Sequence, residues 1–427
     1  MSDLQKKDSQ NIWHPFTQMK LDPFSIPVIS GKGSLLVDEN GNKYIDAVSS
    51  WWVNMHGHAH PYIAKALYDQ YLKLEHSIFA GFTHKPAIDL SEKLLEIVPG
   101  PMHKIFFSDN GSTAVEVGIK MALQYWHNKG KAKTRIIALD DAYHGDTFGA
   151  MSISARGPFN EAFQPLLFDV ETIPPPIPDN ERVSIERLKK IIGTHKDIAA
   201  IIFEPLVMGA GGMIMYSPES LDEIISLCKE NDILCIADEV MTGFGRTGKM
   251  FACEHLKNKV DIMAVSKGIT GGSMALGVTL CQQHIYDAFL SDNKLKAFFH
   301  GHSYTANPLA CSASIASLEL FVKEDTLIKI NKINQWHEGF ITELKKNKNV
   351  DNIRIRGTIL AFDLVTDQKT SYFNNIRDKV YRYFLDQGVL LRPLGNVIYI
   401  MPPYCISKSE LRHVYNTILN MLNKEFL

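Results

Sequence analysis

The chain reads IAAIIFEPL at residues 198–206, ILCIADEV at 233–240 and DIMAVSKG at 261–268. Each segment contains a short continuous apolar run instead of an alternation of apolar and polar residues, which is typical of a strand covered on both faces in a parallel sheet. A helical pattern, ESLDEIISLCKEN at 219–231, separates the first two. Strands separated by helices indicate an α/β domain, so we expect a mostly parallel central sheet.

The same alternation of strand and helix extends toward the N-terminus. KIFFS at 104–108 and RIIAL at 135–139 have strand character, and TAVEVGIKMALQYW at 113–126 has the pattern of a helix. ETIPPPIPDN at 171–180 is predicted to be a surface loop, because proline lacks an N–H group and restricts the residue before it. We expect the large domain to cover residues 51–325.

The sequence at both ends of the chain predicts a smaller α+β unit. After about residue 325, charged helices and short strands follow, ending in two β-rich runs within 388–404. SLLVDENGNKYIDAV at 34–48 has the turn residues of a hairpin between two strand-like runs. We expect a small C-terminal domain over 326–427, with the N-terminal segment 1–50 packed against it.

The composition, 45% hydrophobic and 22% charged over 427 residues, is that of an ordinary globular protein. A formal net charge of −2 gives no general attraction for nucleic acid or anionic lipid, so the expected partners are small molecules and copies of the chain. No apolar run reaches the roughly eighteen residues that span a bilayer, and the polar start MSDLQKKDSQ lacks the apolar core of a signal peptide. We therefore expect a cytoplasmic protein without a membrane partner, whose six scattered cysteines are reduced.

Lys267 follows the apolar run Ile-Met-Ala-Val and precedes a glycine-rich turn. Desolvation at such a place lowers the pKa of a lysine and leaves a neutral amine that can form a Schiff base with a carbonyl group. The alternative for this residue alone is a solvated loop lysine, which is the more common case. Other segments must therefore decide between the two.

Asp238 and Glu239 end the neighbouring predicted strand, ILCIADEV. Open α/β sheets bind ligands at the carboxyl ends of their strands, which makes these acids candidates for a binding site. They could instead cap the next helix or lie in water. A Mg²⁺-binding Walker B pair is a further alternative, but the chain has no GxxxxGK[ST] loop.

Gly111, Ser112 and Thr113 lie between a predicted strand and a predicted helix. The N–H groups of a helix N-terminus, with the helix dipole and a hydroxyl, form a site suited to phosphate, although an ordinary N-cap has the same pattern. Tyr143, in DDAYHGD, follows another strand and could stack on a flat ligand or be a core aromatic residue. Arg392, in LLRPLGN, suits a carboxylate ligand, and a structural ion pair is the alternative.

Together these residues predict one chemistry. A Schiff-base lysine, an acid at a strand end, a phosphate site and a stacking aromatic ring are the parts that pyridoxal phosphate needs. The acid would keep the pyridine nitrogen protonated, so that the ring can accept an electron pair. A metal site is not expected, because the histidines of SSWWVNMHGHAH and FFHGHSY have neither HExxH nor Cys/His zinc spacing.

The sequence resembles the class III pyridoxal-phosphate aminotransferases over nearly its whole length. The motifs that carry this resemblance are IADEVMTGFGRTGKMFACEH at 236–255 and SKGITGG at 266–272. Within the class, the sequence is similar to the branch that acts in biotin biosynthesis. This similarity lies in NIWHPFTQM at 11–19, AVSSWWVNMHGH at 47–58 and LLRPLGNVIYIMPPY at 390–404. The resemblance implies a fold type I transferase, which is aspartate aminotransferase-like, and a homodimer with its active sites at the subunit interface.

The resemblance also implies roles for individual residues. Lys267 matches the Schiff-base lysine, and Asp238 matches the acid that pairs with the pyridine nitrogen. Tyr143 matches a catalytic residue stacked on the ring, and Gly111 and Ser112 match the phosphate site. HGHSYTANPLAC at 300–311 would reach across from the partner subunit. Further implied contacts are His302 and Ser303 for the cofactor, and Phe16, Trp51, Trp52, Tyr143, Arg246, Gly301 and Arg392 for the substrate.

The reaction that the resemblance implies is the transfer of an amino group from S-adenosylmethionine to 8-amino-7-oxononanoate in two ping-pong stages, giving 7,8-diaminononanoate. Arg392 would bind the carboxylate of the acceptor. Phe16 stands where well-known members have tyrosine, and some relatives with phenylalanine resemble lysine users, so lysine is an alternative donor. Further alternatives are another class III ω-aminotransferase and a non-catalytic ligand-binding or metal-binding protein.

Overall fold

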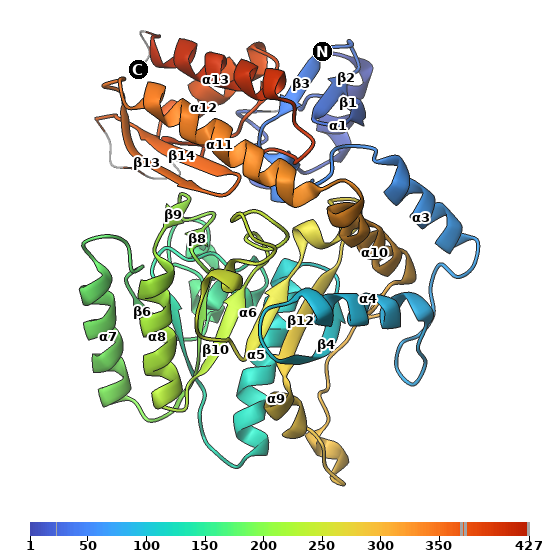
Figure 1. Ribbon diagram of the computed structural model, residues 1–427, viewed down its shortest axis with the longest axis vertical. Coiled ribbons are helices and arrows are strands. Elements are labelled where there is room, and N and C mark those ends of the chain that lie inside the picture. The colour runs from blue at the N-terminus through green and yellow to red at the C-terminus, as the bar shows by residue number, and fades with distance from the viewer. Residues whose placement is uncertain (23, 368–369, 371–373, 425–427) are drawn as a thin grey trace.

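The computed structural model describes residues 1–22, 24–367, 370 and 374–424. Its large sheet has the strand order β4-β12-β11-β10-β7-β5-β6 (Figure 1). The bounds of these strands are β4 (Met102–Ser108), β5 (Arg135–Leu139), β6 (Glu171–Ile173), β7 (Ile198–Phe203), β10 (Leu234–Asp238), β11 (Ile262–Val265) and β12 (Gly277–Gln282). β12 runs antiparallel to β4 and β11, whereas the other neighbouring strands are parallel. The expected α/β fold with a mostly parallel sheet is confirmed.

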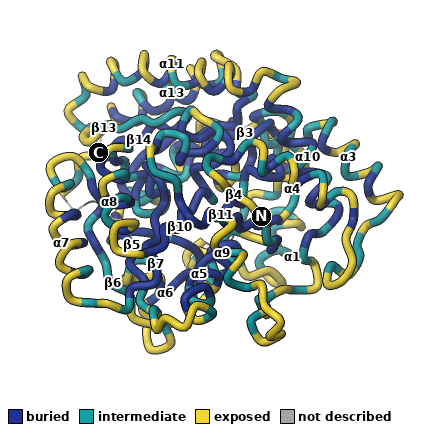
Figure 2. The backbone as a smooth tube through the Cα atoms, turned by 60° about the horizontal axis from the view of Figure 1, so that its bottom comes forward, coloured by how far each residue is buried: buried dark blue, intermediate teal, exposed yellow. Residues whose placement is uncertain are grey.

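Successive residues of the central strands point into two different apolar cores. Ile236 belongs to the core that includes the buried face of α5 (Gly111–Asn128), whereas Cys235 and Ala237 belong to the core on the other face of the sheet. β7, β10 and β11 are buried along their whole length, and Figure 2 shows them within a buried layer. Burial on both faces explains why these strands are continuous apolar runs in the sequence.

Helices cover the sheet and connect its strands. α5 packs across β4, β12, β11, β10 and β7, and α7 packs beside α8. The helices around the sheet are α3 (Pro61–Tyr71), α4 (Lys85–Ile97), α5, α6 (Phe148–Ser152), α7 (Glu181–Thr194), α8 (Pro218–Glu230), α9 (Gln283–Asp287) and α10 (Pro308–Lys323). Short 3-10 helices are η1 (Glu161–Leu166), η2 (Ala252–His255), η3 (Lys267–Thr270) and η4 (Lys294–Lys296), and a short hairpin is formed by β8 (Val207–Met208) and β9 (Ile214–Met215). Within the described ranges, no helix has both the length and the apolar character needed to cross a bilayer.

The C-terminal part forms a smaller antiparallel sheet, β13-β14-β16, with helices beside it (Figure 1). Its elements are α11 (Thr326–Leu344), β13 (Val350–Arg356), β14 (Ile359–Leu364), α12 (Ile376–Asp386), β16 (Val397–Ile400) and α13 (Lys408–Leu422). A third sheet, β1-β2-β3-β15, joins both ends of the chain, because β15 pairs in parallel with β3. The elements of the N-terminal segment and this sheet are α1 (Asp3–Asn11), β1 (Val28–Lys32), β2 (Leu35–Asp38), β3 (Lys43–Asp46), α2 (Ser49–Trp52) and β15 (Val389–Leu390). The domain boundaries at residues 50 and 325 stay predictions.

The segment at 171–180 differs from the predicted surface loop. Its first three residues form the edge strand β6, which pairs with β5, and Pro175 and Pro176 are buried. The prolines do not disturb the pairing of this edge strand, because they begin only after the strand has ended. The proline segment therefore forms part of a cavity wall.

Candidate active site

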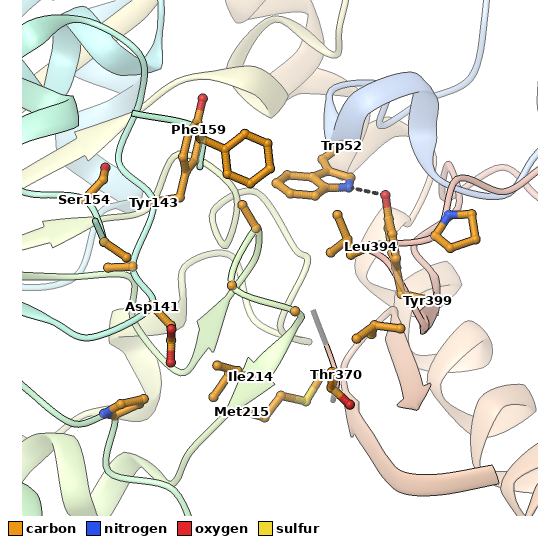
Figure 3. A pocket seen from close by; sticks show the side chains of 18 of the residues that line it. Trp52, Asp141, Tyr143, Ser154, Phe159, Ile214, Met215, Thr370, Leu394 and Tyr399 are labelled. Atoms are coloured by element: carbon orange, nitrogen blue, oxygen red, sulfur yellow. Dashed lines mark hydrogen bonds between the residues drawn. The ribbon is translucent and has the colours of Figure 1, made fainter. Parts of the chain in front are cut away.

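Two adjoining cavities open at the carboxyl edge of the large sheet, where ligands bind in open α/β folds. The larger has a volume of about 1610 Å³ and the smaller about 520 Å³. Trp52, Tyr143 and Lys267 line both. Figure 3 shows the larger cavity between Asp141 and Tyr143 on one side and Leu394 and Tyr399 on the other.

Lys267 lies where the two cavities meet. β11 ends at Val265, and Lys267 begins η3 with a left-handed backbone, φ 44°. Its Nζ is 5.3 Å from the centroid of the Trp52 ring and forms no hydrogen bond or ion pair with the described residues. Burial lowers the pKa of the Lys267 ammonium, although the nearby carboxylates of Asp238 and Glu204 oppose this effect. Burial therefore shifts Lys267 in the direction of the neutral amine that a Schiff base requires.

Asp238 ends β10, beside the strand that leads to Lys267. Its Oδ2 accepts a hydrogen bond from Nδ1 of the buried His144 at 2.7 Å, and its Oδ1 accepts one from Val240 N at 3.0 Å. These two bonds fix the plane of the carboxylate. Because Asp238, His144 and Lys267 all line the smaller cavity, the carboxylate is directed toward the same space as the amine.

Glu239, which the sequence pairs with Asp238, has a different environment. Successive residues of a strand point to opposite faces, and Glu239 lines neither cavity. Its carboxylate accepts hydrogen bonds from Thr242 Oγ1 at 2.6 Å, Ala252 N at 3.1 Å and Cys253 N at 2.7 Å. Glu239 therefore holds the loop between β10 and η2 in place.

Gly111 and Ser112 begin α5, whose N-cap is Asn110. A Cβ atom at Gly111 would lie 2.6 Å from Cγ1 of Val240, so only glycine lets the backbone lie this close. Ser112 Oγ accepts a hydrogen bond from Asp146 N at 3.1 Å. The smaller cavity thus opens onto the N-terminus of a long helix, where N–H groups and the helix dipole favour an anion.

The smaller cavity fits pyridoxal phosphate by the chemistry of its residues. It offers an amine with a lowered pKa, a fixed carboxylate, a helix N-terminus and the ring of Tyr143. Burial raises the pKa of the Tyr143 hydroxyl, so this group stays protonated at neutral pH. These are the groups that were expected for the aldehyde, the pyridine nitrogen, the phosphate and the ring face.

Phe16, Trp51 and Arg392 line the larger cavity. The Phe16 and Trp51 rings meet edge to face at 5.5 Å, and the Arg392 guanidinium lies 5.2 Å from the centroid of the Trp51 ring. Arg392 forms no hydrogen bond or ion pair with the described part of the chain. Its donors can therefore face a ligand carboxylate, and the alternative of a structural ion pair loses support.

Trp52 forms part of the wall between the cavities. Its Nε1 donates a hydrogen bond to Tyr399 Oη at 2.9 Å (Figure 3). Ser49, Ser50 and Trp52 have positive φ angles, a strained backbone that the neighbouring contacts maintain. Ser50 donates its N–H and its hydroxyl to the buried Asp46, both at 2.8 Å.

Arg246 does not lie where the predicted substrate contact would place it. Its side chain is fully buried and lines neither cavity. The guanidinium donates to the carbonyl oxygens of Pro402 at 2.9 Å and of Trp52 and Asn54 at 3.3 Å. Arg246 therefore supports the tryptophan segment from behind and does not contact the cavity.

Gly301, His302 and Ser303 also lie outside both cavities of their own chain. Gly301 and Ser303 are exposed in the segment between η4 and α10. The structure thus brings Lys267, Asp238, Tyr143, Gly111 and Ser112 together and leaves this segment apart. Its predicted contact with the site of a partner subunit stays a prediction.

Glu204 is a residue of the site that was not predicted from the sequence. It directly follows β7, which pairs with β10, and its buried side chain lines the smaller cavity with Asp238. The signal was present, because Glu204 ends the apolar run IAAIIF just as Asp238 ends LCIA. The rule that selected Asp238 selects Glu204 as well.

A parallel sheet with a desolvated lysine and a fixed aspartate at its carboxyl edge, beside a helix N-terminus, defines an enzyme site of the pyridoxal-phosphate type. The chain belongs to the class III aminotransferases, whose family model matches residues 16–422. It is 46% identical to the adenosylmethionine-8-amino-7-oxononanoate aminotransferase of Synechococcus elongatus over 97% of this chain and 99% of the relative.

Two solved structures are similar over nearly the whole chain. The crystal structure of adenosylmethionine-8-amino-7-oxononanoate aminotransferase from Methanocaldococcus jannaschii matches with a TM-score of 0.93 and 38% identity, over 98% of each chain. The PLP-bound form of an amine transaminase from an uncultivated Pseudomonas species matches with a TM-score of 0.90 and 30% identity, over 96% of this chain and 97% of that one. The expected fold type I transferase is confirmed.

Proposed function

We propose that the protein uses pyridoxal phosphate to transfer an amino group from S-adenosylmethionine to 8-amino-7-oxononanoate, giving 7,8-diaminononanoate in biotin biosynthesis. The observation that carries this proposal is the buried Lys267, whose amine lies at the junction of two cavities and has a pKa lowered by burial. The relatives named for the same donor and acceptor support the choice of substrates. A non-catalytic binding protein would have no use for such an amine.

The residues around Lys267 have complementary roles. Bound pyridoxal phosphate supplies a ring that accepts the electron pair left when a proton departs from the substrate carbon. Asp238, fixed by His144, would keep the proton on the pyridine nitrogen. Lys267 would hold the cofactor and would move a proton at the reacting carbon as base and then as acid.

The larger cavity accounts for substrate binding. Arg392, whose guanidinium forms no ion pair with the described residues, is placed to bind the acceptor carboxylate, while Phe16 and Trp51 form an aromatic edge beside it. Phe16 offers no hydroxyl to a donor, which keeps lysine as a second candidate donor. The volume of about 1610 Å³ leaves room for the adenosyl group of the first candidate.

We further infer a homodimer in which Gly301, His302 and Ser303 contact the site of the partner subunit. The exposure of Gly301 and Ser303, and the position of all three residues outside the cavities of their own chain, support this arrangement. The cytoplasmic location stays a prediction from the sequence.

Single-turnover spectra test the proposed function. The yellow enzyme is mixed separately with S-adenosylmethionine and with lysine, and the loss of its absorbance is followed before 8-amino-7-oxononanoate is added. We expect bleaching by S-adenosylmethionine and recovery on adding the acceptor; bleaching by lysine alone would assign the other donor. Lys267→Ala is the control and should show neither the wild-type absorbance nor turnover. A wild-type protein that cannot be loaded with pyridoxal phosphate would contradict the proposal.

A further inference from the structure

Glu204 connects two loops that form different parts of the site. Its Oε1 accepts a hydrogen bond from the backbone N of Tyr143 at 3.2 Å, and its Oε2 accepts one from Gly209 N at 2.8 Å. Tyr143 belongs to the loop after β5, whereas Gly209 begins the turn between β8 and β9. One carboxylate therefore bridges the predicted stacking residue and a turn at the substrate cavity.

The turn that Glu204 holds is tightly packed. A Cβ atom at Gly209 would lie 3.0 Å from Cζ3 of Trp52, and one at Gly211 would lie 2.5 Å from the carbonyl oxygen of Asp141. Gly211 and Trp52 line the larger cavity. A shift of Gly209 toward Trp52 would therefore press on a side chain of the cavity wall.

The electrostatic surroundings of Glu204 make its two hydrogen bonds important. Burial and the nearby carboxylate of Asp238 raise the pKa of Glu204 to about 7, although His144 and the two backbone N–H groups act in the opposite direction. No described residue forms an ion pair with Glu204. Its backbone carbonyl also accepts a hydrogen bond from the hydroxyl of Tyr216, which fixes the end of β7.

We propose that Glu204 is a positioning residue, which holds the Tyr143 loop and the Gly209–Gly212 turn together so that the cofactor face and the substrate wall keep one relative placement. The inference rests on the proposed cofactor. Glutamine at this position keeps the shape of the side chain but can accept through only one of its two terminal atoms, and its NH₂ group would face a backbone N–H. One of the two bridging bonds is then lost.

The test compares Glu204→Gln with Glu239→Gln in the full-length protein. Glu239 is a matched control, because it is also buried and accepts backbone N–H bonds, but lines neither cavity. Pyridoxal phosphate is titrated into apoenzyme, and its Kd is read from the quenching of tryptophan fluorescence, with Tm measured in parallel. We expect Glu204→Gln to raise the Kd about tenfold. Glu239→Gln should lower Tm and leave the Kd unchanged.

A double-mutant cycle shows whether Glu204 acts through Tyr143. In a Tyr143→Ala background, Glu204→Gln should change the Kd much less than in the wild type, because the group that it positions is gone. Equal effects in both backgrounds would overturn the proposal, as would a wild-type Kd for the single variant. Failure of the wild type itself to bind the cofactor would instead contradict the proposed function.

A second variant covers the case in which Glu204→Gln does not fold. Tyr216→Phe removes the hydroxyl that donates to the Glu204 carbonyl, while Tyr216 itself lines neither cavity. Tyr216→Phe should also raise the Kd for pyridoxal phosphate, by a smaller factor than Glu204→Gln. An unchanged Kd in folded Tyr216→Phe would overturn the inference when the first variant cannot be measured.

Discussion

Two hydrogen bonds fix the carboxylate of Asp238, one from His144 and one from Val240 N. Asp238→Asn keeps the size of the side chain but removes the charge that holds a proton on the pyridine nitrogen. We expect the rate of the first half-reaction to fall about a hundredfold or more, because stabilisation of a charged transition state in such a site contributes several kcal/mol. Single-turnover absorbance with the amino donor measures this rate. Asp238 is misassigned if the rate of the asparagine variant equals that of the wild type.

Arg392 lines the larger cavity beside Trp51 and forms no hydrogen bond or ion pair with the described residues, so its main effect should be on a substrate carboxylate. Arg392→Ala should raise the KM for 8-amino-7-oxononanoate about 30-fold or more, since loss of one member of a charge pair costs at least about 2 kcal/mol. The same amino ketone without its terminal carboxylate separates this effect from a general disturbance. Its KM should be nearly the same in variant and wild type.

Arg354 provides the control for this experiment. It also lines the larger cavity, but its guanidinium donates to the carbonyl oxygens of Met213 and Gly212 and forms an ion pair with Asp363 at 2.8 Å. Arg354→Ala should therefore impair both acceptors alike. If Arg392→Ala also impairs both acceptors equally, Arg392 is structural.

Two of the residues that the sequence places at the site lie next to an apolar run in the chain. Lys267 and Asp238 each follow such a run, and the topology of a parallel sheet brings strand ends together without further information. Arg246 could not be placed in this way, because its partners Trp52 and Pro402 are distant in sequence. A local motif does not tell whether a side chain points into a cavity or behind its wall.

At the scale of elements, His337 connects α11 to two other parts of the small sheet region. Its Nε2 donates to the carbonyl oxygen of Thr358 at 3.1 Å, and its Nδ1 accepts from Tyr415 Oη on α13 at 2.7 Å. Burial lowers the pKa of His337 to about 4. The folded state therefore keeps this histidine neutral at a pH where the unfolded chain binds a proton.

This difference in proton binding between the folded and unfolded states predicts how acid changes the free energy of unfolding. The contribution of neutral His337 is complete above the ordinary pKa of 6.5 and is lost progressively as the pH falls toward about 4, by up to about 3 kcal/mol. His337→Gln should lower Tm at pH 7 but reduce the further decrease between pH 6.5 and 4. His413→Gln, at an exposed position of α13, is the control and should keep the wild-type decrease. Identical pH profiles for His337→Gln and the wild type would contradict this role.

The elements that the sequence predicts well are those whose pattern is local. The continuous apolar runs of β7, β10 and β11 and the helical period of α5 appear in the structure where they were expected. The pairing of β15 with β3 could not be read in this way, because it joins residues more than three hundred positions apart. The prolines after β6 were predicted as a surface loop because composition does not tell which face of a loop packs inward.

Two exposed apolar segments lie next to each other on the surface of the molecule. The first includes Tyr71, Leu72 and Phe82, and the second includes Phe299 and Tyr304. The rings of His76 and Tyr304 are 5.3 Å apart, which joins the segments into one surface. Exposed apolar surfaces of this kind mark interaction sites, and Ser303 lies within the second segment, so the surface suits the proposed dimer.

Mixed dimers can decide whether Ser303 serves the site of its own subunit or that of its partner. Lys267→Ala removes the amine, and Ser303→Glu places a negative charge where the phosphate is expected, so each variant alone should be inactive. If Ser303 acts across the interface, a dimer with one subunit of each kind contains one intact site and recovers about half of the wild-type activity. Two affinity tags isolate this hybrid after co-expression, and its steady-state turnover is measured.

The reciprocal hybrid gives the opposite outcome and serves as the control. When both substitutions lie in one subunit and the other is wild type, the remaining lysine faces the altered Ser303 position of its partner, so the hybrid should be inactive. An arrangement within each subunit reverses both results, because the doubly substituted subunit would then leave the wild-type site untouched. A protein that stays monomeric at the concentrations used for turnover would contradict the dimer itself. Once each single variant has been shown to be inactive, the pair of hybrids distinguishes the two arrangements by activity.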